Sequence, residues 1–175
     1  MSQPTESNFD PSTSSLLKIG SLDPGVTYVE RTAVRAILQN PLNKRLAIIH
    51  VKKGNYYKLP GGGIEPNEDH SIAVAREILE ETGCMISMDI GTCLATCEEY
   101  RNDLHQISYC YVTKMIEDTG RPELTELEAS EGLSHRWVSV NEAMEVMQDS
   151  VPTSELGKFI KERDLFFVEK FADIF

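Results

Sequence analysis

The sequence is poor in basic residues and has no long apolar run. Its 17 lysines and arginines are outnumbered by 28 aspartates and glutamates, so the formal net charge is -11. A field of that sign repels long polyanions. No apolar stretch approaches the roughly 20 residues that a membrane-crossing helix needs, and the N-terminal segment lacks the layout of a secretory signal. We therefore expect no nucleic-acid polymer and no membrane as partner, and a cytoplasmic location.

Cysteine is scarce as well. The four cysteines form no CxxC pair and have no nearby histidine pair at zinc-finger spacing. Free cysteine commonly behaves as a small hydrophobe. We expect reduced, mostly buried thiols, and a metal or disulfide held by Cys93 and Cys97 is the alternative. The cysteines are Cys84, Cys93, Cys97 and Cys110.

What is present is an ordinary globular composition, with 41% hydrophobic and 26% charged residues. Residues 1–20 are rich in serine, threonine, proline and asparagine, which predicts a flexible N-terminal tail. Residues 21–175 have the length of one domain. The segment 158–171 is amphipathic and rich in aromatic residues, so it is expected to pack on the domain or on a second subunit. A monomer and a homodimer both stay open.

The pattern of apolar and polar residues predicts mainly antiparallel strands, one central helix and helices at the end. This order favours an α+β fold over a doubly wound parallel sheet. The helix is expected from Asp69 to Thr82, with Gly83 where it stops. The other expected elements are a hairpin of residues 26–38 and 45–53, an antiparallel pair of residues 85–100 and 105–116, a short strand at 136–140, and helices at 141–148 and 155–171.

The central helix is expected to carry an acidic face. At about 100° per residue, Glu77, Glu80 and Glu81 gather on one side. Like charges so placed destabilise an isolated helix by some tenths of a kcal/mol per pair. The opposite side is predicted to pack on the sheet through Ile72, Ala75, Ile78, Leu79 and Thr82.

A glycine-rich segment, PGGG at residues 60–63, precedes this helix. Glycine lets the backbone bend sharply and approach a ligand closely, and the segment brings Glu68 near the start of the helix. Carboxylates that converge beside such a bend suit Mg²⁺ or Mn²⁺, since both prefer oxygen ligands. A solvated acidic face is the alternative.

Residues 62–84 resemble the Nudix box, written G-x5-E-x7-R-E-U-x-E-E-x-G-U with U bulky and aliphatic. Ile78 fills the first U position, whereas Cys84 stands at the last one, a departure that affects packing and not the charged groups. The resemblance implies a Nudix-type α/β/α sandwich of the α+β class, with a mixed, largely antiparallel sheet, over roughly residues 25–150. Every fixed position is met, by Gly62, Glu68, Arg76, Glu77, Glu80, Glu81 and Gly83.

The resemblance also implies a role for each box residue. Glu77, Glu80 and Glu81 would bind divalent metal ions, and Gly62 would offer its main-chain carbonyl. Arg76 would hold Glu77 through a charge-assisted pair. The remaining box glutamate, at position 68, would sit near the metal and contact it through water.

A further glutamate from a loop beyond the box completes the site in several Nudix enzymes. Glu131, just before the strand-like residues 136–140, matches that position and is the predicted additional catalytic residue. Glu98, Glu99 and Glu128 are the competitors.

The implied enzyme is a Mg²⁺-dependent Nudix pyrophosphohydrolase, with Mn²⁺ as a substitute, that cleaves a phosphoanhydride of a small nucleotide-like substrate by water attack at phosphorus. A nucleoside triphosphate of the 8-oxo-dGTP kind is the first expectation, because KLPGGG resembles nucleotide-cleaning members. ADP-ribose hydrolases tend to carry alanine where Gly61 stands, and dinucleoside polyphosphate hydrolases carry a tyrosine near the place of Tyr100. These two activities and a non-catalytic nucleotide sensor are the alternatives.

Residues that flank the site are expected to recognise the rest of the substrate. Lys58, Tyr57 and Arg101 are the predicted substrate-binding residues, with Tyr56 and Asn102 as further candidates. For each of them, simple packing on the sheet or exposure to solvent is the alternative.

Overall fold

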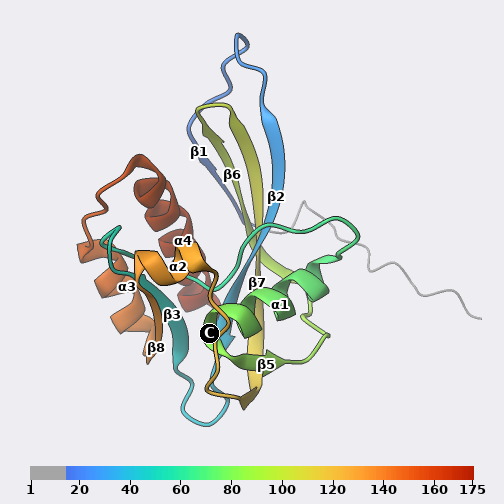
Figure 1. The fold of residues 1–175 in the computed structure, drawn as a ribbon, viewed down its shortest axis with the longest axis vertical. Coiled ribbons are helices and arrows are strands. Elements are labelled where there is room, and N and C mark those ends of the chain that lie inside the picture. The colour runs from blue at the N-terminus through green and yellow to red at the C-terminus, as the bar shows by residue number, and fades with distance from the viewer. Residues whose placement is uncertain (1–14) are drawn as a thin grey trace, which may run out of the picture.

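The computed structural model describes residues 15–175 as a mixed β-sheet between helices (Figure 1). Helix α1 covers one face of the sheet, and α3 and α4 cover the other. The predicted α+β class with a mixed sheet is thereby confirmed. In chain order the elements are β1 (Ser15–Ile19), β2 (Val29–Gln39), β3 (Leu46–Val51), β4 (Tyr56–Lys58), α1 (His70–Thr82), β5 (Cys84–Ile86), β6 (Cys93–Arg101), β7 (Leu104–Asp118), α2 (Glu126–Glu131), β8 (Leu133–Val138), α3 (Val140–Asp149) and α4 (Glu155–Ile174).

The sheet has the strand order β1-β6-β7-β2-β3-β4, with β5 paired to β7 and β8 paired to β3. The predicted antiparallel pair is present as β6 and β7, in which Tyr100 faces His105. The pairings β1–β6 and β2–β7 are parallel and the others are antiparallel. The β2–β7 pairing is long and runs from Val29 opposite Leu104 to Gln39 opposite Lys114.

Strand β2 supplies both layers of the core because alternate side chains of a strand point to opposite faces. Ile37 packs with Phe167 of α4 on one face. Val34 and Ala36 pack with Ile78 of α1 on the other. The helices therefore cover the sheet as the α/β/α sandwich requires.

The predicted hairpin forms only at its turn. Strands β2 and β3 pair at Gln39 and Leu46 and then diverge. Residues 60–64 occupy the edge of β2 that β3 leaves open, through hydrogen bonds from Val34 N–H to the Gly62 carbonyl (2.9 Å) and from Ala36 N–H to the Pro60 carbonyl (2.9 Å). The splayed strands thus make room for the glycine loop, residues 60–63.

Helix α1 begins and ends where the sequence predicts. The Asp69 side chain caps it by accepting a hydrogen bond from the Ile72 N–H, and Gly83 ends it in the left-handed conformation. The predicted packing face is correct at Ile78 and Thr82, which are buried, but wrong at Ile72 and Leu79, which are 42% and 36% exposed. The buried face consists of Ala73, Val74, Glu77, Ile78, Glu81 and Thr82.

Two terminal segments contradict or refine the predictions. Residues 15–19, assigned to the flexible tail, form β1 and pair in parallel with β6; the rest of the predicted tail, residues 1–14, lies outside the described residues. The amphipathic segment 158–171 lies in α4, where Phe167, Val168 and Phe171 are buried in the core of the same chain. None of the helices between residues 15 and 175 is long and apolar enough to span a bilayer.

The cysteines behave as predicted. All four are free, and three of them are buried while Cys93 is half-buried.

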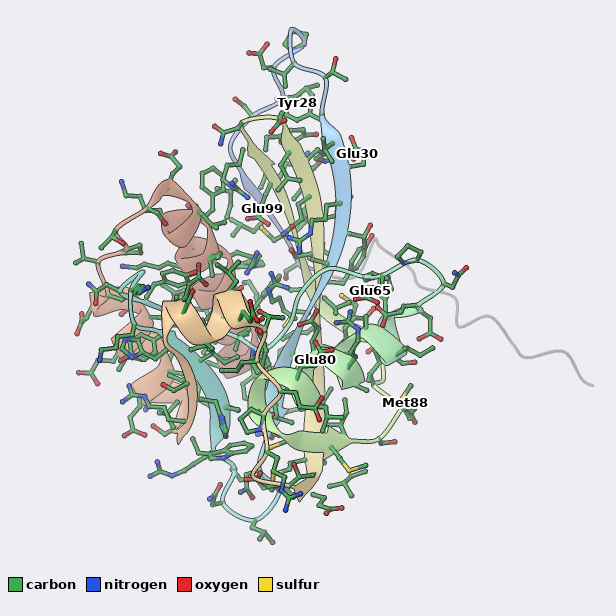
Figure 2. All side chains as sticks on the ribbon, viewed as in Figure 1. Tyr28, Glu30, Glu65, Glu80, Met88 and Glu99 are labelled. Carbon is green, nitrogen blue, oxygen red and sulfur yellow. The ribbon has the colours of Figure 1, made fainter. Side chains whose placement is uncertain are left out.

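The far-end cluster is a group of polar side chains at the end of the sheet where Figure 2 labels Tyr28 and Glu30. It consists of Glu30, Glu98, Tyr100 and His105. His105 Nδ1 lies 2.5 Å from Glu30 Oε2, and its Nε2 lies 3.0 Å from Glu98 Oε1. The His105 ring stacks on Tyr100, with centroids 4.5 Å apart. These side-chain contacts link the strands β2, β6 and β7.

This cluster predicts a pH-dependent contribution to stability. Burial disfavours the charged imidazole, but hydrogen bonds to Glu98 and Glu30 outweigh burial and raise the pKa of His105. The stabilisation is therefore complete below the unfolded-state pKa of about 6.5 and is lost as pH rises through the higher folded-state pKa. We expect the difference in urea midpoint between wild type and His105→Gln to shrink from about pH 6 to about pH 8. A constant difference would contradict the assignment.

Candidate active site

The glycine loop is pressed between β2 and two glutamates of α1. The Gly61 N–H donates to Glu81 Oε2 at 2.8 Å. Gly61 has a φ of 144°, which L side chains rarely adopt, and a Cβ there would overlap the Val34 carbonyl. A Cβ on Gly62 would overlap the Glu77 carboxylate. Only glycine allows this approach of the backbone to the carboxylates.

Arg76 joins three carboxylates at one guanidinium. Its Nε and Nη2 bind Glu68 at 2.6 and 2.9 Å, and its Nη1 donates to Glu77 at 2.8 Å and to Glu80 at 3.3 Å. Nη2 also donates to the Gly63 carbonyl at 3.0 Å. The hydrogen bond from Arg76 lowers the pKa of Glu68, and burial raises the pKa of Glu80. The predicted contact between Arg76 and Glu77 is present.

Glu81 is the most buried carboxylate of the box, at 3% exposed. Burial raises the pKa of Glu81, while Lys58 and the Gly61 N–H oppose that shift. The Lys58 Nζ lies 2.5 Å from Glu81 Oε1. Lys58, predicted to bind substrate, thus lies in the site as the ion-pair partner of a predicted metal ligand.

The donor set fits a hard divalent cation by its chemistry. Glu77, Glu80 and Glu81 offer carboxylate oxygens beside backbone carbonyls, which are the ligands that Mg²⁺ and Mn²⁺ prefer. Across residues 15–175, no three acidic, histidine or cysteine side chains converge closely enough to hold a metal as they stand. Arg76 holds only one oxygen each of Glu77 and Glu80. Both oxygens of Glu81 are bound, by Lys58 and by the Gly61 N–H, so metal binding by Glu81 requires one of these two contacts to break.

The Gly62 carbonyl, predicted to bind a metal, fits this role poorly. It accepts hydrogen bonds from the Val34 N–H at 2.9 Å and from Arg35 Nη1 at 3.4 Å, so it faces β2. Successive backbone carbonyls in extended chain point in opposite directions. The Gly61 carbonyl accepts no hydrogen bond within the part of the chain that the structure describes. Its oxygen is therefore better suited than that of Gly62 to bind a metal ion.

Glu131 lies at the end of α2, and its side chain shares no hydrogen bond or ion pair with the box residues among residues 15–175. Its charge acts on Tyr56 and contributes, after burial, to raising the pKa of Tyr56. The charge of Glu128, in the same helix, contributes after burial to raising the pKa of Glu80. The Glu128 carboxylate also caps α2 by accepting a hydrogen bond from the Thr125 N–H. The role of Glu131 stays a prediction.

The other competing glutamates lie on the sheet. Glu98 is held by His105 and Lys18 in the far-end cluster. Glu99 is 4% exposed and is bound by Arg163 and Gln106. Figure 2 shows Glu99 on the sheet, apart from Glu80 on α1. Tyr100, on which the dinucleoside polyphosphate alternative rests, also belongs to the far-end cluster.

Tyr57 is not part of this site, contrary to the prediction. It stacks on His50, with ring centroids 4.6 Å apart, and the Arg136 guanidinium lies 5.0 Å from its ring. These residues line a separate groove beside α3. The physical reason is the alternation of side chains along β4, which sends Tyr57 to the face opposite Lys58.

Two arginines of β2 lie near the glycine loop and were missed in the sequence. Arg31 lies against Gly63, and its Nη1 donates to Gln106 at 2.6 Å. Arg35 is 5% exposed and contacts the loop directly. Two arginines four positions apart in the strand VERTAVRAIL, and therefore on one face of it, are the pattern that could have found them. Arg101, a predicted substrate-binding residue, acts electrostatically on Arg31, and its side chain forms no hydrogen bond or ion pair with residues 15–175.

An acidic helix, a glycine loop and a mixed sheet between helices together define an α/β/α protein with a carboxylate-rich candidate site. A family model described as "NUDIX domain" matches residues 29–156. The chain belongs to the NUDIX domain family, which confirms the resemblance seen in the box.

Curated relatives are similar over part of their length. The chain is 33% identical over 97 residues to diphosphoinositol polyphosphate phosphohydrolase 3-alpha of Homo sapiens, which is 54% of this chain and 54% of that protein. Diphosphoinositol polyphosphate phosphohydrolase 2 of Rattus norvegicus is also 33% identical over 97 residues, covering 54% and 49%. The chain thus spans about half the length of the curated relatives it matches.

Solved structures share the fold. A NUDIX hydrolase from Nitrosomonas europaea superimposes with a TM-score of 0.61 at 16% identity, over 83% of this chain and 90% of that one. The MutT protein from Methanosarcina mazei Go1 gives a TM-score of 0.57 at 17% identity, over 85% and 96%.

Proposed function

We propose that this chain is a divalent-metal-dependent Nudix pyrophosphohydrolase, which cleaves a phosphoanhydride bond of a small diphosphate compound by attack of water at phosphorus. The observation that carries the proposal is the Arg76 guanidinium, which gathers Glu68, Glu77 and Glu80 beside a loop that only glycine can form. A nucleotide sensor would not need this set.

The residues of the site have different roles in the proposed reaction. When bound, a divalent ion neutralises phosphate charge and lowers the pKa of a coordinated water. Arg76 orients Glu77 and Glu80 through charge-assisted hydrogen bonds. The Gly61 N–H holds one oxygen of Glu81. The loop therefore fixes donors before the substrate arrives, which lowers the cost of ordering them during the reaction.

A nucleoside triphosphate is the first substrate we propose. Arg31 and Arg101 lie on the same face of the sheet, since Arg31 pairs with Gln106 and Arg101 faces Leu104 of the same strand β7. They extend positive charge away from the carboxylates, where the remaining phosphate of such a substrate would lie. A diphosphoinositol polyphosphate is the second candidate, because the curated relatives carry that compound in their names.

Arg31 is expected to bind a substrate phosphate rather than act in the chemical step. Replacing it with alanine should raise KM by about tenfold and leave kcat nearly unchanged, because a charge-assisted contact worth about 1.4 kcal/mol is lost equally from ground state and transition state. Steady-state kinetics with the preferred substrate measures both constants. Arg45→Ala is the matched control, since Arg45 is exposed and pairs with Glu142. An unchanged KM in Arg31→Ala would rule out this role.

A substrate panel tests the proposal as a whole. The purified protein is incubated with Mg²⁺ and with nucleoside triphosphates, oxidised nucleoside triphosphates, ADP-ribose, dinucleoside polyphosphates and diphosphoinositol polyphosphates, and the release of phosphate, pyrophosphate and nucleoside monophosphate is measured. Hydrolysis that requires the metal supports the enzyme. Binding without product on every compound would favour the sensor.

A further inference from the structure

A buried ion cluster connects the C-terminal helix to the glycine loop. Asp164 and Arg163 of α4 are 0% and 1% exposed. Asp164 Oδ2 accepts a hydrogen bond from the Leu59 N–H at 2.8 Å, and its Oδ1 accepts one from Arg163 Nε at 2.6 Å. Leu59 directly precedes the loop. A carboxylate 105 residues further along the chain therefore holds the entrance of the loop.

Arg35 continues this connection to the middle of the loop. Its Nε lies 4.0 Å from Asp164 Oδ1, and its Nη1 donates to the carbonyls of Val34 at 2.6 Å and Gly62 at 3.4 Å. Burial and the neighbouring Arg163 lower the pKa of Arg35 to about 10, while Asp164 opposes that shift. Asp164 thus stabilises a cation that lies against the loop.

The cluster is a costly way to fill the core. Removing several charged side chains from water costs free energy, whereas burying apolar side chains of the same size is favourable. Replacing such clusters by apolar residues is therefore often neutral or stabilising. Arg35 Nε and Arg163 Nη2 are buried without a hydrogen-bond partner in the described part of the chain. Packing alone therefore gives no physical reason for these charges.

We propose that Asp164 is a positioning residue for the metal-binding site. By holding the Leu59 N–H and Arg35, it fixes the loop in which the Gly61 N–H binds Glu81 and Gly62 packs against Glu77. Asp164 acts through these groups. The inference rests on the proposed function, because it assigns a task only if Glu77 and Glu81 bind a metal.

The test compares wild type with Asp164→Asn and Phe171→Leu. Asparagine keeps the shape of the side chain and an oxygen for the Leu59 N–H, but removes the charge that faces Arg35. Phe171 is 1% exposed and lies about two turns further along α4 in the same core. Its replacement destabilises the same helix without touching the loop contacts.

Two readouts separate positioning from stability. Mn²⁺ titrated into the substrate-free protein and followed by calorimetry should bind on the order of tenfold more weakly to Asp164→Asn, as is typical for residues that orient metal ligands. The amides of Leu59, Gly61 and Gly62 should also exchange with deuterium faster. Phe171→Leu should lose thermal stability and keep the Mn²⁺ affinity of wild type.

The outcomes are distinguishable. Equal Mn²⁺ affinity in folded Asp164→Asn and wild type overturns the inference and leaves the proposed function intact. A wild-type protein that binds no Mn²⁺ contradicts the proposed function itself, and the inference with it. If Asp164→Asn does not fold, Arg35→Lys takes its place: it keeps the positive charge, but one ammonium cannot replace the guanidinium that spans Asp164 and Gly62. Wild-type Mn²⁺ affinity in that variant equally overturns the inference.

Discussion

Glu77→Gln is expected to lower kcat by at least about 100-fold. Changes to residues that merely orient metal ligands commonly cost 10- to 100-fold, and the loss of a predicted ligand should exceed that. Glu77 is 9% exposed and lies between Arg76 and the glycine loop, so no other carboxylate can take its place without moving the loop. Steady-state hydrolysis of the preferred substrate with saturating Mg²⁺ measures the effect.

The fold should survive this substitution. Glutamine has the same shape, and its oxygen can still accept the hydrogen bond from Arg76. Removing one negative charge also relieves repulsion from Glu80 and Glu81, which lie three and four residues further along the helix. Circular dichroism and the thermal transition should therefore resemble those of wild type. Glu117→Gln, an exposed glutamate of β7, is the matched control, and turnover near the wild-type rate in Glu77→Gln would refute the assignment.

Gly61→Ala should damage both stability and activity. The residue has a φ of 144°, and an added Cβ would overlap the Val34 carbonyl and come within 2.9 Å of the Arg35 Cα. Both obstacles are backbone atoms, which cannot rotate away. We expect a loss of about 3 kcal/mol in the free energy of unfolding. Displacement of the loop should lower kcat/KM on the order of 100-fold.

Gly91→Ala is the control that isolates the backbone strain. Gly91 also has a positive φ, of 66°, but an added Cβ would meet nothing within 4 Å. We expect a cost of about 1 kcal/mol and wild-type turnover. Urea unfolding and steady-state kinetics on both variants give the comparison. Equal losses at the two positions would show that the close approach of loop and sheet has no particular role.

The elements with strong local patterns could be predicted from the sequence. Asp69 and Gly83 mark the ends of α1, because capping and the left-handed stop depend on neighbouring residues alone. Two features with weaker patterns were missed. Helix α2 has a capping box between Thr125 and Glu128 that could have revealed it. Strand β1 lies next to residues of tail-like composition, and only its pairing with β6 makes it a strand.

The packing face of α1 shows why a helical wheel was not sufficient. The wheel assumes that apolar side chains are buried and charged ones exposed, yet Glu77 and Glu81 are buried while Ile72 and Leu79 are exposed. Burial of the two carboxylates is possible because Arg76, Lys58 and the Gly61 N–H bind them. Two of these partners lie outside the helix, so its sequence alone could not indicate them.

The sequence by itself determined the family, the acidic residues of α1 and the need for glycine in the loop, because each depends on residue types at fixed spacing within 25 residues of chain. Tertiary structure alone decided the rest. It placed Tyr57 on the face opposite Lys58, turned the Gly62 carbonyl toward β2, and brought Asp164 from α4 to the Leu59 N–H. The physical reason is that strand pairing and helix packing join residues far apart in the chain, and local patterns carry no information about which of them meet.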